Sequence, residues 1–377
     1  MLKRIYLSPT AYYFKDSFKL PSGELSYSDI YKDVNAFEMS IKTYLETDKP
    51  CLALNSGTSA LHIALNLAGV TSGDYVLCQS HTFVASANTI RYQGAIPVFI
   101  DSEETTWNID QQYLESAVKD LNSKNIYPKA LIATSLYGMP FEVDAIDAFA
   151  KANNIKVIED SAEALGSSYK NRKCGTLGDY GILSFNYNKI ITSGGGGILV
   201  CKNEEEYSRG LKLATQAKEK SIHYQHQEIG YNYRIGHLNA KIGVAQMSVL
   251  EQNIKSRRQL NDWYRNLFEN IEGVEVQFEK SMSYHSNHWL SAILVEPSQT
   301  AGITREDIRL VLEKDQIESR PLWKPMHLQP LYKDYPYYGA KVCETLFEKG
   351  LCLPSGSNMT DEDRERIENA IQRLFKI

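Results

Sequence analysis

One lysine, Lys189, is the residue whose type and setting point most directly to chemistry. It follows an acidic strand end, Ile158-Glu159-Asp160, and precedes a glycine block, Gly194 to Gly197. A buried lysine amine loses its proton readily and can then attack a carbonyl carbon to form a Schiff base. The order of these three features therefore predicts a lysine that holds an aldehyde cofactor.

Pyridoxal phosphate (PLP) is such an aldehyde, and it requires a carboxylate at its pyridine nitrogen, an aromatic plate on its ring and donors around its phosphate. The expected carboxylate is Asp160, because ligands of open α/β sheets collect outside the carboxyl ends of the strands. Its charge would keep the pyridine nitrogen protonated. The run Asp160-Ser161-Ala162-Glu163 also resembles a capping box, so a helix N-cap is the alternative interpretation.

The segment from Asn55 to His62 is typical of a strand end, a tight turn and a helix start. Backbone amides at a helix N-terminus, together with the hydroxyls of Thr58 and Ser59, form a site for an anion such as phosphate. Ser184, on the strand that leads to Lys189, adds another donor. An ordinary helix start without a ligand is the alternative.

Phe83 follows the expected strand Tyr75-Cys78, where its ring would stack on a flat heterocycle; packing in the core is the alternative.

The glycine block suggests a dinucleotide-binding loop, but that fingerprint follows a strand and opens a helix. Here the block precedes a strand-like run, Ile198-Leu199-Val200. A turn that returns the chain past the lysine fits better.

Between residues 50 and 200, short apolar runs alternate with amphipathic segments, which is typical of a mostly parallel sheet with crossover helices. The expected strands are Tyr75-Cys78, Pro97-Ile100, Ala130-Thr134, Lys156-Glu159, Ile182-Phe185 and Gly197-Cys201. The expected helices are Ser59-Leu67, Val84-Arg91, Gln111-Leu121 and Val143-Ala152. These elements predict a doubly wound α/β domain.

The pattern changes near His237, where apolar residues recur at helical spacing as far as about Phe268 and predict one long helix. Beyond it we expect strands at 274–278, 290–295 and 317–320, a helix at 305–313, and a closing helix that Thr360 and Asp363 open as a capping pair. We therefore expect a large domain over residues 1–250 and a small α+β domain over 251–377. The aromatic-rich segment 10–38 receives no assignment.

The composition narrows the class of protein. A chain of 377 residues with 43% hydrophobic content can bury one large core and a smaller one. The net charge of −5, with both signs interspersed, argues against nucleic acid as a partner.

The six cysteines show no Cys-x-x-Cys pair and are expected to be buried free thiols. No run approaches the ~20 apolar residues of a membrane helix and no signal peptide is evident, so we expect a cytoplasmic protein without a membrane partner or a metal site.

Three segments carry a resemblance that extends over nearly the whole chain: residues 56–62, 159–166 and 184–192. With them, the sequence resembles the DegT/DnrJ-type family of nucleotide-sugar aminotransferases. It is most similar to the branch that aminates UDP-linked 4-keto-6-deoxy-N-acetylhexosamines, on the path to UDP-N-acetylbacillosamine. The supporting runs are 101–103, 107–108, 223–226, 231–234, 320–327 and 352–360.

The resemblance implies the PLP-dependent aspartate-aminotransferase-like fold of type I, with L-glutamate as the amino donor and cell-surface glycan synthesis as the context. Lys189 would hold PLP and move the proton in both half-reactions. The implied cofactor-binding residues are Gly57, Thr58, Ser59, Phe83, Asp160, Glu163, Ser184, Asn186, Lys189 and Asn232. The implied substrate-binding residues are Tyr187, Arg320, Trp323, Lys324 and His327. In the family, Asn232 reaches the phosphate in the neighbouring subunit, which implies a homodimer with shared sites.

The sequence departs from the family pattern near the expected substrate. Tyr187 replaces a glycine beside the lysine, His288 replaces an arginine, and Lys19 to Glu24 replace a Trp-Ile-Ala-Pro-x-Gly-Pro element. The exact sugar therefore stays open. The alternatives are an aminotransferase that acts at carbon 3 or on a dTDP-linked sugar, a non-catalytic regulator of the same fold, and a nicotinamide dehydrogenase that rests on the glycine block alone.

Overall fold

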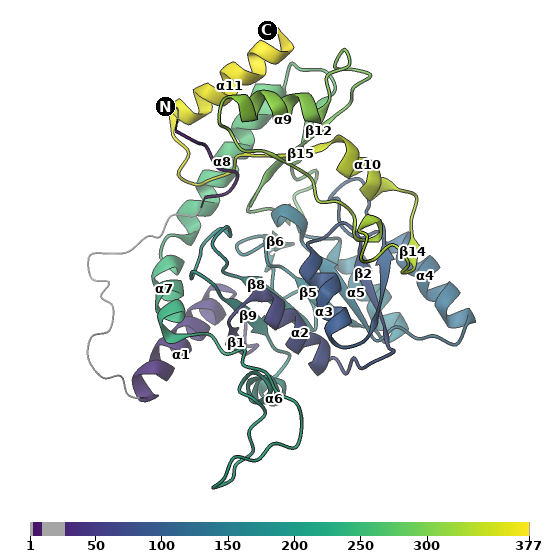
Figure 1. Ribbon diagram of the computed structural model, residues 1–377, viewed down its shortest axis with the longest axis vertical. Helices are drawn as coiled ribbons and strands as arrows, with labels where there is room; N and C mark the ends of the chain where they lie inside the picture. Colours follow the sequence, from purple (N-terminus) through teal and green to yellow (C-terminus); the bar gives the residue numbers. More distant parts are fainter. Residues whose placement is uncertain (1–2, 10–26, 377) are drawn as a thin grey trace.

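An eight-stranded, mostly parallel sheet forms the centre of the protein in the computed structural model, which describes residues 3–9 and 27–376 (Figure 1). In spatial order its strands are β1 (Cys51–Leu54), β9 (Gly197–Val200), β8 (Tyr180–Ser184), β5 (Lys156–Asp160), β4 (Ala130–Thr134), β2 (Tyr75–Gln79), β3 (Ile96–Ile100) and β14 (Tyr337–Tyr338). Strand β9 runs antiparallel to both of its neighbours, and the other neighbouring pairs are parallel. The predicted α/β fold is confirmed.

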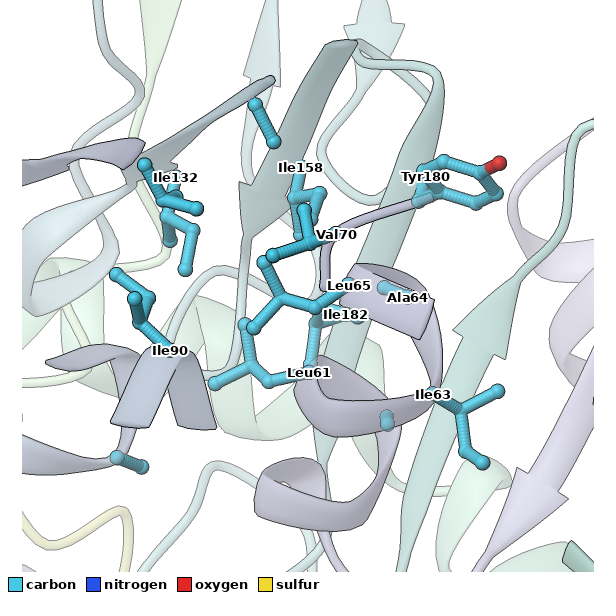
Figure 2. Close-up of a cluster of buried hydrophobic side chains, with 14 of the residues drawn as sticks. Leu61, Ile63, Ala64, Leu65, Val70, Ile90, Ile132, Ile158, Tyr180 and Ile182 are labelled. Carbon is cyan, nitrogen blue, oxygen red and sulfur yellow. The ribbon is translucent and has the colours of Figure 1, made fainter. Parts of the chain in front are cut away.

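Both faces of this sheet are buried. Successive side chains of a strand point to opposite faces, and here both sets of side chains are apolar. In β2, Val76 and Cys78 join one apolar cluster while Leu77 joins the cluster on the other face. Figure 2 shows the first cluster, in which Ile132 and Ile158 from the strands pack with Leu61 from a helix. The continuous apolar character of these strands therefore reflects helices on both sides.

The helices divide between the two faces of the sheet. One face is covered by α2 (Gly57–Leu67), α3 (Val84–Tyr92) and α6 (Glu204–Ala214). The other is covered by α1 (Tyr27–Tyr44), α4 (Gln111–Ser123), α5 (Val143–Asn153) and α7 (His237–Met247). The strands and helices expected between residues 50 and 200 are all present, with ends that differ by one or two residues. Helices α1 and α6 were not predicted, and Lys19 to Glu24 lie outside the described residues.

The long helix expected from His237 to about Phe268 is instead two helices, α7 and α8 (Leu250–Phe268). The break falls at Ser248 and Val249. The Ser248 hydroxyl donates to the backbone oxygen of Ala245 at 2.8 Å. A serine side chain that bonds a helix carbonyl in this way slightly destabilises and bends a helix.

The C-terminal elements form a second, smaller layer at the end of the molecule where both termini lie (Figure 1). Its antiparallel sheet has the order β10 (Val274–Val276), β12 (Ser291–Val295), β15 (Gly350–Leu353) and β13 (Arg320–Pro321). Its other helices are α9 (Arg305–Lys314), α10 (Val342–Lys349) and α11 (Asp361–Phe375). The predicted capping pair is confirmed, since Thr360 and Asp363 form a capping box at α11.

Two segments cross the predicted domain boundary in the described structure. Ile5 forms a bridge with Ile317 and packs in the C-terminal core, whereas β14 adds to the edge of the large sheet beside β3. The strand expected at 317–320 is observed only as β13 in the described structure, since Ile317 forms an isolated bridge and β13 begins at Arg320. The division into 1–250 and 251–377 remains a prediction.

Strands β6 (Ser168–Tyr169), β7 (Arg172–Lys173) and β11 (Tyr284–His285) form a three-stranded sheet, and short 3-10 helices occupy η1 (Leu136–Gly138) and η2 (Met326–Leu328). All six cysteines are buried free thiols, as predicted. Over residues 3–9 and 27–376, no helix is both long and apolar enough to cross a membrane.

Candidate active site

A cavity of about 230 Å³ lies at the carboxyl ends of the central strands. Strands β4, β5 and β8 end at Thr134, Asp160 and Ser184, and all three residues line it. The cavity also contains the first residues of α2. Of the predicted cofactor-binding residues, it brings together Gly57, Thr58, Phe83, Asp160, Glu163, Ser184, Asn186 and Lys189.

The amine of Lys189 contacts a carboxylate and an aromatic ring in this cavity. Its Nζ lies 3.4 Å from Oε1 of Glu163 and 4.3 Å from the centroid of the Trp289 ring. The indole N–H of Trp289 donates to the backbone oxygen of Asn188 at 2.8 Å. The ring is therefore fixed both to the lysine and to the residue that precedes it.

The Glu163 carboxyl group is buried in the cavity wall. Burial raises its pKa from 4.5 to about 7, while the charge of Lys189 and a hydrogen bond from the Tyr137 backbone N–H oppose that rise. The Tyr137 N–H donates to Oε2 at 2.8 Å, while Oε1 accepts from the Lys189 amine. A carboxyl group of this kind can take up and release a proton near neutral pH.

Asp160 is almost fully buried at the end of β5, with 4% of its surface exposed. Burial raises the pKa of its carboxyl group, and a hydrogen bond from Ser86 opposes this. The Ser86 hydroxyl donates to Oδ2 at 2.7 Å, and the Ala162 N–H donates to Oδ1 at 3.3 Å. The chain after Asp160 continues in turns, so the helix N-cap interpretation does not apply.

The start of α2 approaches the ends of two strands through glycines. A Cβ added to Gly57 would lie 3.1 Å from Cβ of Ser184, and a Cβ added to Gly197 would lie 2.3 Å from the backbone carbon of Ser56. Larger residues would fill this space. Gly194 to Gly196 form a bend that leads into β9, which begins at Gly197, so the block precedes a strand as predicted.

Ser59 does not line the cavity, although it belongs to the same helix start. Its hydroxyl donates to Oδ1 of Asn55 at 2.6 Å, and its backbone N–H donates to the N-cap hydroxyl of Ser56 at 3.0 Å. Ser59 therefore stabilises the N-terminus of α2 and does not face the cavity. Asn55, which was not among the predicted site residues, lines the cavity instead.

Phe83 stands at the N-cap of α3 with 52% of its surface exposed, so it is not a core residue. Its ring centroid is 5.4 Å from that of Trp323, with the planes tilted by 51°. Trp323 also packs on Tyr137 at 5.2 Å. One aromatic wall thus runs from Phe83 toward the turn that holds Glu163.

A second cavity of about 460 Å³ adjoins the first, because Phe83, Asn188, Trp289 and Trp323 line both. It contains three of the five predicted substrate-binding residues: Tyr187, Arg320 and Trp323. The remainder of its wall comes largely from the segment Tyr6 to Pro9 and from Glu318, Pro321 and Cys352. The Arg320 guanidinium pairs with Glu318 at 2.8 Å and remains mostly exposed.

Lys324, His327 and Asn232 lie outside both cavities. His327 is stacked on Tyr337 with ring centroids 3.7 Å apart, and its Nδ1 is 2.7 Å from the Ser80 hydroxyl. These contacts engage one face of the imidazole ring and its Nδ1 atom. Asn232 is exposed at the surface, where its backbone oxygen accepts a hydrogen bond from Asn55 at 3.3 Å.

Trp289 and Thr134 belong to the site but were not among the predicted site residues. Trp289 lies 100 positions from Lys189 and has no regular spacing to it, so the contact depends on how the C-terminal layer packs on the large sheet. Thr134 ends an expected strand, as Asp160 does. The rule that ligands collect at strand ends would have been enough to propose it.

A lysine beside buried carboxylates at the carboxyl ends of a doubly wound sheet is the arrangement that a PLP-dependent enzyme requires, and comparison with known proteins gives the family. The chain belongs to the DegT/DnrJ/EryC1/StrS aminotransferase family, which it matches over residues 21–372. It is 42% identical over 389 residues to the "Putative pyridoxal phosphate-dependent aminotransferase EpsN" of Bacillus subtilis (strain 168), with 100% of this chain and 97% of that protein covered.

Two further proteins place the chain within the family. It is 35% identical over 322 residues to the GDP-perosamine synthase of Escherichia coli O157:H7, with 85% of each chain covered. The crystal structure of a DegT DnrJ EryC1 StrS aminotransferase from Brucella abortus matches with a TM-score of 0.84 at 26% identity, covering 92% of this chain and 91% of that one. PLP is therefore the cofactor, and relatives of the chain act on nucleotide-linked sugars.

Proposed function

We propose that this enzyme transfers the amino group of L-glutamate to UDP-2-acetamido-2,6-dideoxy-4-ketohexose and forms the 4-amino sugar for cell-surface glycan synthesis. The observation that carries the proposal is the pair of adjoining cavities. The first contains the lysine and the buried carboxylates, and the second is larger, bordered by a guanidinium and aromatic rings, and shares a wall with the first. A cofactor and a sugar nucleotide need two such compartments that meet at the reacting carbon.

The residues of the first cavity fit PLP. The Lys189 amine would hold its aldehyde carbon, the Asp160 carboxylate would pair with its ring nitrogen, and the exposed face of Phe83 would stack on its ring. Gly57, Thr58 and Ser184 would surround its phosphate, since backbone N–H groups at a helix N-terminus favour an anion. When bound, PLP supplies an electron sink for the carbon that loses or gains the amino group.

Lys189 would move the proton between substrate and cofactor carbon atoms in both half-reactions. Glu163 is its hydrogen-bonding partner at 3.4 Å, and a pKa of about 7 lets this carboxyl group accept or return a proton near neutral pH. The Tyr137 N–H keeps the carboxyl group oriented. General acid–base catalysis by such groups typically contributes about 10²–10⁴-fold to a rate.

The second cavity would receive the sugar nucleotide. Arg320 offers a guanidinium whose geometry suits a diphosphate, and Glu318 holds it at the cavity wall. Tyr187, with 68% of its surface exposed, and Trp323 offer aromatic faces to the sugar or the base. The N-terminal segment Tyr6 to Pro9 would close the remaining side.

We further propose a homodimer in which Asn232 serves the partner's site. Asn232 is exposed beside Asn55 at the cavity rim, and the segment after α6 projects away from the body (Figure 1). That segment exposes Ile222, Tyr224 and Ile229, which is unusual for apolar side chains unless another chain covers them. Mixing inactive Lys189→Ala and Asn232→Ala proteins tests this, because exchange of subunits would restore at most about a quarter of the activity only if the sites are shared.

The substrate proposal is tested by assaying the purified enzyme with L-glutamate and a panel of UDP-, GDP- and dTDP-linked ketosugars, keto at carbon 3 or 4. We expect 2-oxoglutarate release with the UDP-linked 4-keto sugar and a 4-amino product by NMR. A kcat/KM higher by tenfold or more for another sugar, ~1.4 kcal/mol of transition-state preference, would reassign the substrate.

A GDP-linked 4-keto sugar is the second candidate. The observation in its favour is the 35% identity to the GDP-perosamine synthase of Escherichia coli O157:H7. The same panel distinguishes it, because the two candidates differ in both the base and the substituent at carbon 2.

A further inference from the structure

Three buried hydroxyl groups link the cavity to Asp160 in a continuous row. Oγ1 of Thr134 is 2.9 Å from Oγ1 of Thr82, which is 3.1 Å from Oγ of Ser86, and Ser86 donates to Oδ2 of Asp160 at 2.7 Å. Thr82 and Ser86 are fully buried, and Thr134 is 3% exposed. We call Thr134, Thr82 and Ser86 the hydroxyl chain.

The hydrogen-bonding capacity of each group fixes the direction of this chain. Ser86 has one hydroxyl proton and gives it to Asp160, so Thr82 must be the donor in its contact with Ser86. Thr82 then has no proton left for Thr134, and Thr134 must donate to Thr82. All three protons therefore point toward the carboxylate.

An ordinary structural role would give Ser86, the member of the hydroxyl chain that lies on a helix, a different partner. Buried serine and threonine residues on helices commonly donate to the backbone oxygen one turn earlier. Thr89, one turn further along α3, does this, since its hydroxyl donates to the Ser86 backbone oxygen at 3.1 Å. Ser86, in the first turn of the same helix, instead donates to the Asp160 carboxylate, and Thr82, which precedes the helix, donates to Ser86.

We propose that the hydroxyl chain holds Asp160 as a carboxylate and turns Oδ1 toward the ring nitrogen of PLP, so that Thr82, Ser86 and Thr134 are positioning residues for the cofactor. This inference rests on the proposed placement of PLP at Asp160. Aligned hydroxyl groups polarise one another, so each link strengthens the last one. Oδ2 is occupied by Ser86, and among the described residues Oδ1 has only the 3.3 Å contact with the Ala162 N–H.

The chain counters the effect of burial on Asp160. Burial raises the pKa of this carboxyl group, and the Ser86 hydrogen bond is the largest influence that lowers it. The other titratable groups that interact with Asp160 are Lys189, Glu163 and Cys78. Loss of the chain should therefore raise the pH at which Asp160 becomes protonated as the solution is acidified.

The experiment measures the affinity for PLP by dialysing holoenzyme against graded PLP concentrations from pH 5 to 8. We expect Ser86→Ala to weaken binding by about 10-fold or more, and Thr82→Val and Thr134→Val by about 3- to 10-fold, since hydrogen bonds to charged groups are the strongest. In each variant the loss of affinity on acidification should begin at a higher pH. Thr82→Ser and Thr134→Ser, which keep the hydroxyl, should restore both properties.

Thr89→Val is the matched control, because it removes a fully buried hydroxyl from the same helix outside the chain and should leave affinity and pH profile unchanged. Wild-type affinity and pH profile in Ser86→Ala and Thr82→Val would overturn the inference. Asp160→Asn separates the two proposals: wild-type PLP affinity there would reject the placement of PLP itself, whereas a loss there with intact hydroxyl variants rejects only the chain. If one valine variant does not fold, Ser86→Ala and the other valine variant decide.

Discussion

The Trp289 ring lies 4.3 Å from Nζ of Lys189 and donates its indole N–H to the backbone oxygen of Asn188, so one side chain from the C-terminal layer holds the lysine from two directions. Trp289→Phe keeps a ring but loses the hydrogen bond, and Trp289→Ala loses both. We expect kcat to fall about 5-fold in the first and about 30-fold in the second, because a cation–π contact and a hydrogen bond each contribute about 1 kcal/mol. Steady-state kinetics check this order, and equal kcat values in the two variants would contradict it.

Replacing Lys189 should separate cofactor binding from cofactor attachment. Lys189→Ala keeps Asp160, Phe83 and the start of α2, so it should still bind PLP while losing nearly all turnover. Borohydride reduction followed by mass spectrometry should find PLP bound to residue 189 in the wild type and no covalent PLP in the variant. Wild-type activity in Lys189→Ala would exclude the lysine from the reaction.

Local sequence patterns were sufficient for the parts of the site that lie on consecutive elements. Asp160, Ser184 and the Gly57 turn could be placed because each follows or ends a strand of the same parallel sheet, and such ends meet at one edge. The capping box at Thr360 was found in the same way, from two residues three positions apart.

Contacts between distant segments could not be predicted by that route. The place of Trp289 under Lys189, the stacking of His327 on Tyr337 and the bridge between Ile5 and Ile317 depend on how separate layers dock. No periodicity in the sequence records that docking. The break at Ser248 was missed for another reason, because the apolar pattern continues across it.

Glu163 should make the stability of the cofactor-free protein depend on pH. Its folded-state pKa of about 7 lies above its ordinary value of 4.5. Its contribution to the free energy of unfolding is therefore fully present below pH 4.5 and is lost as pH rises through 7. The loss amounts to at most about 3 kcal/mol, at 1.36 kcal/mol for each unit of the pKa difference. Thermal unfolding from pH 4.5 to 8 should therefore show a smaller decline in Glu163→Gln than in the wild type.

Glu163→Gln also removes the carboxylate partner of Lys189, which could alter stability independently of the carboxyl titration. The comparison is therefore repeated in a Lys189→Met background, where this ion pair is absent from both proteins. Parallel pH curves with and without Glu163 in both backgrounds would show that its carboxyl group does not titrate in this window.

Arg320 should affect one half-reaction and leave the other unchanged. Arg320→Gln removes the guanidinium that lines the second cavity, so KM for the sugar nucleotide should rise about 10-fold, the effect of losing one charge-assisted hydrogen bond. Pre-steady-state reaction with glutamate alone should keep its wild-type rate. Lys324→Gln is the matched control, because Lys324 lies outside both cavities; an equal rise in KM there would indicate a change of long-range charge rather than a contact.

Two neighbouring glycines give a test of how closely β9 must approach α2. A Cβ on Gly197 would lie 2.3 Å from the backbone carbon of Ser56 and 2.5 Å from the backbone nitrogen of Gly57, whereas a Cβ on Gly195 would meet no atom within 4 Å. Gly197→Ala must therefore displace the helix start, and we expect a loss of about 1–3 kcal/mol in the free energy of unfolding together with weaker PLP binding. Gly195→Ala should stay within about 0.5 kcal/mol of the wild type. Chemical denaturation of both cofactor-free variants measures this difference, and equal stability would mean that the helix start can shift at little cost.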